Sequence, residues 1–268
     1  MSVQAEVRYL NEEWRARDDI PRIGDRDSRR ANTSKRAVAI HDARERLAAG
    51  RVDLDENGFA LLALSSAVED FRDEAEVKAV YYPEIEALAR RTTGGSEVFI
   101  TQHVIRTEDT SDFNKAYARF LHCDYSLADP RDMAARALEK RGLRLDDYPR
   151  REFAWYNSWQ PFDNAVFKNP LAVVDAASLA DDDVVDYYYT GYNTAGTSGK
   201  SAMPLPNPAH RFYYVSRMAT DEVLFIKQLD TRGRRAAVCP HTSFDDPTSP
   251  PEAPPRRSIE VRMMVAFG

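Results

Sequence analysis

From residue 96 onward, the chain is a succession of short runs rich in β-branched and aromatic residues, separated by turn residues. One helical segment interrupts them, at 129–143. Many short strands with a single helical insertion predict a β-sandwich or barrel rather than a parallel sheet. There are about nine such runs: SEVFITQHVIRT, FLHCDYS, REFAWYNSWQPF, PLAVVDAAS, DVVDYYYTGYN, HRFYYVSRM, EVLFIKQLD, RAAVCPHTSF and RRSIEVRMMVAF.

The first 95 residues have a mixed pattern. The stretch TSKRAVAIHDARERLAAG at 33–50 predicts a helix, with Thr33 or Ser34 as its N-cap. A turn and an apolar strand are expected at 55–64, and a second helical region at 73–95. The N-terminal part is therefore expected to supply helices and extended segments around a β core.

We expect a single domain over residues 1–268. In it, 1–95 pack as a helical and extended region on a core formed by 96–268. Two stretches are expected to be loops because they are rich in glycine, serine and proline: 194–209 and 245–255.

The bulk composition excludes several classes of protein. The apolar share of 43% and the charged share of 30% are typical of a globular protein. The net charge of −6, without dense basic clusters, argues against a nucleic-acid partner. Cys123 and Cys239 are too few for a disulfide scaffold, and the charged first thirty residues contain no apolar stretch that could be a leader or a membrane span. We expect a cytoplasmic protein with no membrane partner; the oligomeric state is not indicated.

The stretch FLHCDYSL places His122 and Asp124 two residues apart in an apolar segment. On a strand, residues i and i+2 face the same side, so an imidazole and a carboxylate can converge on one metal ion. A second, distant histidine would complete two imidazoles and one carboxylate, the set that suits non-haem Fe(II) oxygenases. Alone, the pair is weak evidence, because a buried histidine is more often a satisfied core group.

The end of the chain strengthens the metal hypothesis. Histidines that could supply the third ligand from a late strand are His210 and His241, and we favour His241. In PRRSIEVRMMVAF, Arg256, Ser258, Glu260 and Arg262 share parity and therefore one face of a strand. A guanidinium and a hydroxyl at that spacing can hold a dicarboxylate.

Other polar residues in β-rich runs are weaker candidates. Lys227 lies in an apolar strand, where it contacts either a co-substrate or an acid such as Asp230. Asn157 is the polar member of a stripe otherwise made of Trp155 and Trp159, so this face is expected to line a cavity. Candidates for contact with substrate are Asn157, Trp159, Tyr213 and His103, the last being a pocket wall or core residue.

Taken together, these stretches resemble a family of Fe(II)/2-oxoglutarate-dependent oxygenases of secondary metabolism. The family includes the cephamycin methoxylation hydroxylase, an aspergillic acid hydroxylase and a gibberellin desaturase. The resemblance extends from residue 55 to 266 and keeps order and spacing. Its matching stretches are DENGFALLALSSAVEDFRDEAEVKAVYYPEIEAL, HCDYS, WQPF, NPLAVVD, HRFYYVSRMATDEVLFIKQLD and PHTSFDDPTSPPEAPPRRSIEVR.

The resemblance implies a mainly β fold with flanking helices, a double-stranded β-helix of the jelly-roll, cupin-like kind. It implies Fe(II) held by His122, Asp124 and His241, and 2-oxoglutarate held by an arginine of the last strand. Arg256 matches that arginine best, and Arg262 is the alternative. The implied reaction uses O2 to convert 2-oxoglutarate to succinate and CO2, and hydroxylates, desaturates or cyclises a small natural product or amino-acid-derived intermediate at an unactivated C–H bond.

Two departures from the family pattern concern the pocket. Gln160 stands where the family often has arginine, and Arg257 stands where it often has glutamate. Neither changes a proposed ligand. Two other functions stay open at this point: a cupin-type metal enzyme that is independent of 2-oxoglutarate, and a non-catalytic jelly-roll binding protein.

Overall fold

The computed structural model describes residues 1–107, 117–148, 150, 152–190, 198–233 and 236–268. The strands are β1 (Ser2–Leu10), β2 (Arg22–Ile23), β3 (Thr33–Asp42), β4 (Phe59–Ala63), β5 (Glu97–Arg106), β6 (Glu152–Pro161), β7 (Leu171–Val174), β8 (Val184–Thr190), β9 (Ser198–Pro204), β10 (Phe212–Tyr214), β11 (Glu222–Asp230), β12 (His241–Ser243) and β13 (Ser258–Phe267). The α-helices are α1 (Arg26–Asn32), α2 (Arg44–Ala48), α3 (Leu54–Asn57), α4 (Glu74–Glu76), α5 (Tyr82–Thr93) and α6 (Pro130–Glu139).

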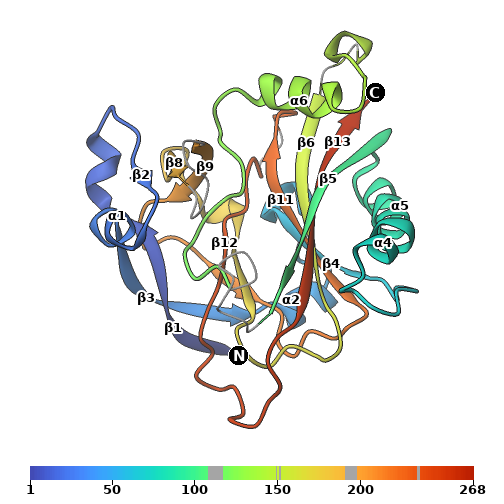
Figure 1. The fold of residues 1–268 in the computed structure, drawn as a ribbon. Coiled ribbons are helices and arrows are strands. Elements are labelled where there is room, and N and C mark those ends of the chain that lie inside the picture. Colours follow the sequence, from blue (N-terminus) through green and yellow to red (C-terminus); the bar gives the residue numbers. More distant parts are fainter. Residues whose placement is uncertain (108–116, 149, 151, 191–197, 234–235) are drawn as a thin grey trace.

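The strands form two large sheets and one small sheet (Figure 1). One five-stranded sheet has the order β1-β3-β10-β7-β12, and the other has the order β4-β11-β6-β13-β5. The third sheet is β2-β8-β9. Strands from before residue 96 take part in all three sheets, so the N-terminal region is woven into the β architecture.

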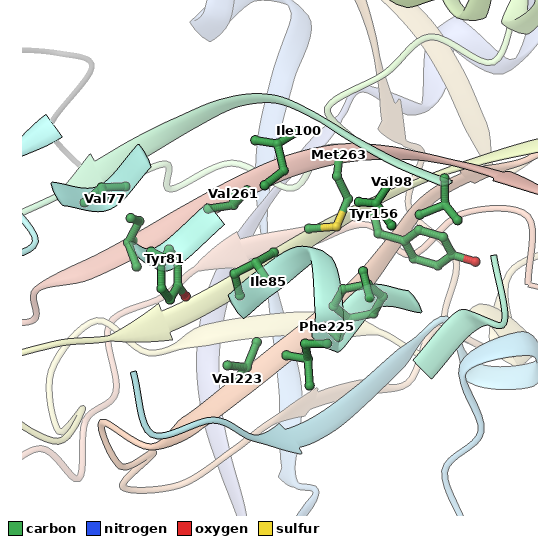
Figure 2. Close-up of a cluster of buried hydrophobic side chains, with 14 of the residues drawn as sticks. Val77, Tyr81, Ile85, Val98, Ile100, Tyr156, Val223, Phe225, Val261 and Met263 are labelled. Atoms are coloured by element: carbon green, nitrogen blue, oxygen red, sulfur yellow. The ribbon is translucent and has the colours of Figure 1, made fainter. Parts of the chain in front are cut away.

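The helical segment from Glu74 to Thr93 covers the outer face of the β4-β11-β6-β13-β5 sheet (Figures 1 and 2). Its Tyr81 and Ile85 pack with Val261 and Phe225 of the sheet, and all four are at most 1% exposed. Burying each such side chain stabilises the fold by about 1.5–3 kcal/mol. The other face of β13 is thereby left to the interior, where its polar residues lie.

The predicted helical region at 73–95 is confirmed, with a change of pitch in its middle. A single π-helical segment spans Val77–Tyr81, and α5 follows with Pro83 in its first turn. Pro83 is tolerated there because the first amide groups of a helix need no partner within it. Gly94 ends the helix in the left-handed conformation with φ of 70°.

The helix predicted over 33–50 is wrong. Thr33–Asp42 is strand β3, and only Arg44–Ala48 is helical. The strand pairs antiparallel with β1 and parallel with β10. Alanines and a plausible cap favour a helix locally, but pairing along both edges outweighs that preference.

Two further predictions need correction. The stretch 194–209 is not all loop, because Ser198–Pro204 is strand β9 and pairs along β8; residues 194–197 lie outside the described part. FLHCDYS forms no extended strand, because His122 bridges His241 while Cys123 bridges Ala202 on another sheet. Because these two neighbouring residues pair with different strands, they cannot form a continuous β-ladder with either one. The proline-rich stretch 245–255 is a loop, as predicted.

None of the helices in the described part of the chain is long and apolar enough to cross a membrane.

Candidate active site

The stretch from Leu121 to Asp124 joins two sheets at the inner end of a cavity. Backbone hydrogen bonds connect His122 to His241 in both directions, at 3.1 and 2.9 Å. The amide of Leu121 donates to the carbonyl of Arg8 at 2.9 Å, and Cys123 bonds to Ala202 of β9. The cysteine is directed into an apolar cluster, so the two flanking polar side chains are directed the other way.

His122, Asp124 and His241 come together as predicted. One potential ligand atom from each lies within 4.8 Å of the others. The Nε2 atoms of His122 and His241 are 3.6 and 3.8 Å from the Asp124 carboxylate oxygens, too far for good hydrogen bonds. Two imidazoles and a carboxylate at this spacing are the donor set of a non-haem Fe(II) centre.

The outer nitrogen of each imidazole has a partner that orients the ring. Nδ1 of His122 lies 2.8 Å from the carbonyl of Phe120, which can only accept, so this nitrogen carries the proton and Nε2 is free to bind a metal. Nδ1 of His241 lies 3.3 Å from the side-chain amide nitrogen of Gln228, which is a donor. The side-chain oxygen of Gln228 also accepts a hydrogen bond from the backbone amide of Asp124 at 3.0 Å, so Gln228 connects Asp124 with His241.

The Asp124 carboxylate is held ionised by its neighbours. Arg262 approaches it at 2.7 Å and also bonds to Glu260 at 2.8 Å, and the Asn157 amide donates to it. Although burial acts to raise it, Arg262 and the two imidazoles hold the pKa of Asp124 well below its usual range. Burial, followed by repulsion from His122, lowers the pKa of His241 to about 4. A neutral His241 imidazole beside an ionised Asp124 carboxylate suits metal ligation.

Arg256 is a buried cation that has no counterion in the part of the chain that the structure describes. It is 2% exposed, and burial lowers its pKa to about 9. Its guanidinium stacks 4.1 Å from the Tyr117 ring and bonds to Ser243 at 3.2 Å, but within the described residues it makes no ion pair. Its Nε and the hydroxyl of Ser258 are both buried, and neither has a hydrogen-bond partner among the described residues. Unsatisfied donors at these two positions fit the distal carboxylate of a 2-oxo diacid.

A cavity of about 1040 Å³ opens in front of His122, Asp124 and Arg262. Part of its wall is aromatic, with Phe120, Tyr187 and Tyr189. Another part of the wall comes from β1 and β3 and carries charged side chains. This volume is large enough for a drug-sized molecule.

The remaining predicted site residues lie in other places. His103 is on the outer face of β5, where its Nδ1 is 2.8 Å from the Tyr82 hydroxyl. Tyr213 is buried in an apolar cluster, and Trp159 lies in the same cluster, 5.3 Å from Arg256. The Lys227 ammonium contacts Asp55 at 2.5 Å and Asp230 at 2.8 Å, which supports the salt-bridge alternative.

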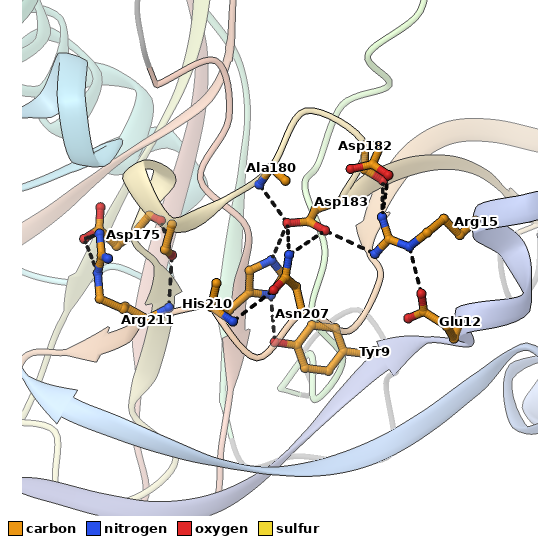
Figure 3. Close-up of polar contacts among 12 residues, drawn as sticks. Tyr9, Glu12, Arg15, Asp175, Ala180, Asp182, Asp183, Asn207, His210 and Arg211 are labelled. Carbon is orange, nitrogen blue, oxygen red and sulfur yellow. Dashed lines mark hydrogen bonds and ion pairs between the residues drawn. The ribbon is translucent and has the colours of Figure 1, made fainter.

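His210 lies in a separate polar cluster and contacts no residue of the triad (Figure 3). Its Nε2 bonds to Asp183 and its Nδ1 bonds to the Tyr9 hydroxyl, both at 3.0 Å. The preference for His241 over His210 as the third residue of the triad therefore agrees with the geometry.

Sequence reasoning missed Gln228, Tyr117 and Ser243. Gln228 follows Lys227 in an otherwise apolar strand, so a second polar residue there was an available signal. Tyr117 and Ser243 are brought to Arg256 only by the fold, and nothing local distinguishes them.

Comparison with known proteins agrees with this geometry. A family model described as "Oxidoreductase/YMDC permease-like domain" matches residues 9–266. The Fe(II)/2-oxoglutarate-dependent dioxygenase nvfI of Aspergillus novofumigatus is 30% identical, over 88% of this chain and 85% of its own length. The hydroxylase/desaturase efuI of Hormonema carpetanum is 31% identical, over 91% of this chain and 88% of its own length.

Among solved structures, the iron and alpha-ketoglutarate-dependent endoperoxidase NvfI superimposes with a TM-score of 0.86. It is 25% identical and covers 100% of this chain and 98% of that one. The chain therefore belongs to the Fe(II)/2-oxoglutarate-dependent dioxygenases, and its fold is the predicted jelly roll with flanking helices. It is an oxidoreductase that uses Fe(II), 2-oxoglutarate and O2.

Proposed function

We propose that this dioxygenase modifies an unactivated C–H bond of a small natural product, with His122, Asp124 and His241 as its iron ligands. The observation that carries the assignment is the convergence of two imidazole Nε2 atoms on one carboxylate at distances too long for hydrogen bonds. When bound, Fe(II) and 2-oxoglutarate supply the oxidising power for this chemistry. The protein orients the ligands through Phe120 and Gln228 and shapes a cavity for the substrate.

Arg256 and Ser258 are proposed to hold the distal carboxylate of 2-oxoglutarate. Arg262 is less suited, because its guanidinium already contacts the carboxylates of Asp124 and Glu260. Arg256 lacks such a partner among the residues described, and its Nε and the Ser258 hydroxyl are unsatisfied. A dicarboxylate would provide both the missing negative charge and the missing acceptors.

Residues 1–268 are proposed to act as one domain, because both large sheets combine strands from before and after residue 96. The partner is a small molecule, in keeping with the family. Hydroxylase, desaturase and endoperoxidase all occur among the names of the similar proteins. Which of these outcomes applies here depends on where the substrate carbon lies relative to the metal.

An anaerobic titration tests the assignment. Protein supplied with Fe(II) is titrated with 2-oxoglutarate, and the visible charge-transfer absorption of the chelated keto acid is followed. Arg256→Ala is expected to raise the half-saturating 2-oxoglutarate concentration by about 10–100-fold, the loss of a charge-assisted hydrogen bond. Arg257→Ala is the matched control, since Arg257 is its neighbour and pairs with Asp163 instead.

The control is expected to change the half-saturating concentration less than twofold. A larger effect for Arg262→Ala than for Arg256→Ala would transfer the anchor to Arg262. If wild-type protein gives no absorption band, the triad assignment is wrong.

A further inference from the structure

The wall of the cavity carries positive charge that no carboxylate neutralises among the residues that the structure describes. Most charged side chains there are paired: Lys35 with Glu6 at 2.7 Å, and Arg119 with Asp245 at 2.8 Å. Arg8 and Arg29 also line the cavity, yet neither contacts a carboxylate among the residues that the structure describes. These two arginines, the surplus pair, belong to β1 and α1.

Arg8 is a half-buried cation with only neutral partners. Its guanidinium bonds to the Thr33 hydroxyl at 3.1 Å and reaches the Thr33 carbonyl at 3.5 Å. Burial, then repulsion from Arg29 and Arg30, lowers the pKa of Arg8, with Glu6 acting weakly in the opposite direction. Keeping like charges together near a partly buried wall is unfavourable unless an anion joins them.

Arg8 is also tied to the metal-binding stretch. Its carbonyl accepts the amide hydrogen bond of Leu121, the residue before His122. Arg8, His122 and Asp124 line the same cavity, so a ligand group held by the Arg8 side chain lies in the cavity that the triad faces. Beside Arg29, the aromatic wall continues into a small, mostly apolar hollow lined by Ile23, Phe120 and Met203.

We propose that Arg8 and Arg29 bind an anionic group, of the carboxylate type, on an otherwise apolar substrate whose body lies against Phe120, Tyr187 and Tyr189. This inference rests on the proposed function of the same cavity and specifies the class of substrate. The anion anchors one end of the molecule, and the aromatic wall directs the rest toward the triad. The charged contact at one end of the substrate and the apolar packing along the rest fix its position and its orientation in the cavity.

A pair of fluorescent probes tests this inference without turnover. The probe 1-anilinonaphthalene-8-sulfonate carries an anion on an apolar body, and N-phenyl-1-naphthylamine has the same body without the charge. Protein loaded with Mn(II) and 2-oxoglutarate is titrated with each. Arg8→Gln and Arg29→Gln are each expected to weaken binding of the sulfonate about tenfold, the loss of one charge-assisted contact. Binding of the neutral probe is expected to change less than twofold.

Two further variants separate a local contact from a general charge effect. Arg36→Gln removes the same charge from β3 at an exposed position that does not line the cavity. It is expected to leave sulfonate binding within twofold, while Arg8→Lys is expected to recover part of it. Arg29 contacts Thr33 through its backbone carbonyl and not through its side chain. Arg29→Gln therefore stays informative if Arg8→Gln perturbs folding, which circular dichroism monitors.

Several results would overturn the inference: sulfonate binding unchanged in both glutamine variants, equal weakening of both probes, an Arg36→Gln effect of the same size, or no saturable sulfonate binding at all. The charge dependence of probe binding reports on the surplus pair alone. It would therefore be unaffected if Arg256 proved not to bind 2-oxoglutarate. Conversely, 2-oxoglutarate could bind at Arg256 while probe binding shows no dependence on charge. That result would refute only the proposal that the substrate is anionic.

Discussion

Two buried polar clusters in this protein both contain histidine and aspartate but differ in their hydrogen bonding. The triad cluster contains His122, Asp124 and His241, and the Asp183 cluster contains Asp183, His210 and Tyr9 with Arg15 and Asn207 (Figure 3). In the Asp183 cluster both nitrogens of the histidine have partners at 3.0 Å. In the triad the Nε2 atoms face a carboxylate at 3.6 and 3.8 Å.

The difference lies in which hydrogen bonds are completed. Asp183 accepts bonds from Ala180, Asn207, His210 and Arg15, so its carboxylate is saturated by protein groups. By contrast, Oδ1 of Asn157, which bonds to Asp124 through its amide nitrogen, has no partner among the described residues, and neither do Nε of Arg256 and the hydroxyl of Ser258. A polar cluster whose hydrogen bonds are complete stabilises a fold, whereas buried polar atoms without protein partners are available to a ligand.

The largest expected effect is on catalysis. His122→Ala removes a proposed ligand, and 2-oxoglutarate turnover should fall by more than about 100-fold, beyond the range for loss of an outer partner. Unfolding should change little, because the side chain borders a cavity rather than filling the core. Succinate release and a thermal melt measure the two quantities. His210→Ala should show the opposite pattern, with turnover kept and the melting temperature lowered. Full activity of the His122 variant would refute the triad.

The next largest effect concerns stability. Asp183→Ala leaves the buried partners of this carboxylate unpaired, and it should lower the free energy of unfolding by about 3–5 kcal/mol. Asp182→Ala is its matched control, because Asp182 bonds the same Arg15 at 2.8 Å from a side chain that is 72% exposed. The control should cost less than about 1 kcal/mol. Urea unfolding compares them, and equal losses would show that the Asp183 cluster is not the stabilising element.

Strand β13, whose Arg262 contacts Asp124, could be predicted because its pattern is local. Alternation in PRRSIEVRMMVAF placed Arg256, Ser258, Glu260 and Arg262 on one face of a strand. The structure keeps the last three on the interior side of β13, whereas Arg256 lies before the strand begins. His103 was placed in the pocket wall or core by sequence, but the register of β5 against β13 shifts between Ile100 and Gln102. This irregularity puts Gln102 on the cavity side and His103 beneath Tyr82.

Other parts of the site depend on pairing between distant segments, which no local pattern contains. Strand β3 forms because β1 and β10 flank it, and β10 lies far along the chain. The same pairing brings Arg8 into the cavity that holds His122. The triad itself could be proposed from residue types and order, whereas the N-terminal contribution to the cavity could not.

The smallest expected effect is a pH dependence that belongs to the Asp183 cluster. Burial, opposed by Asp183, lowers the pKa of His210 below its ordinary value near 6.5. The unfolded chain therefore binds a proton at His210 more readily than the folded protein does. Stability contributed by neutral His210 is complete above pH 6.5 and is lost as the pH falls below it, by at most about 1.4 kcal/mol per pH unit. The pKa of Asp183 is also lowered, so its own contribution is lost only at still lower pH.

Urea unfolding of the metal-free protein between pH 7.5 and 5 measures this slope. His210→Gln keeps groups that can bond Tyr9 and Asp183 but cannot titrate, so the difference between wild type and variant isolates His210 from the other histidines. A difference that does not change with pH would mean that His210 stays neutral in both states over this range, or that another group carries the acid sensitivity.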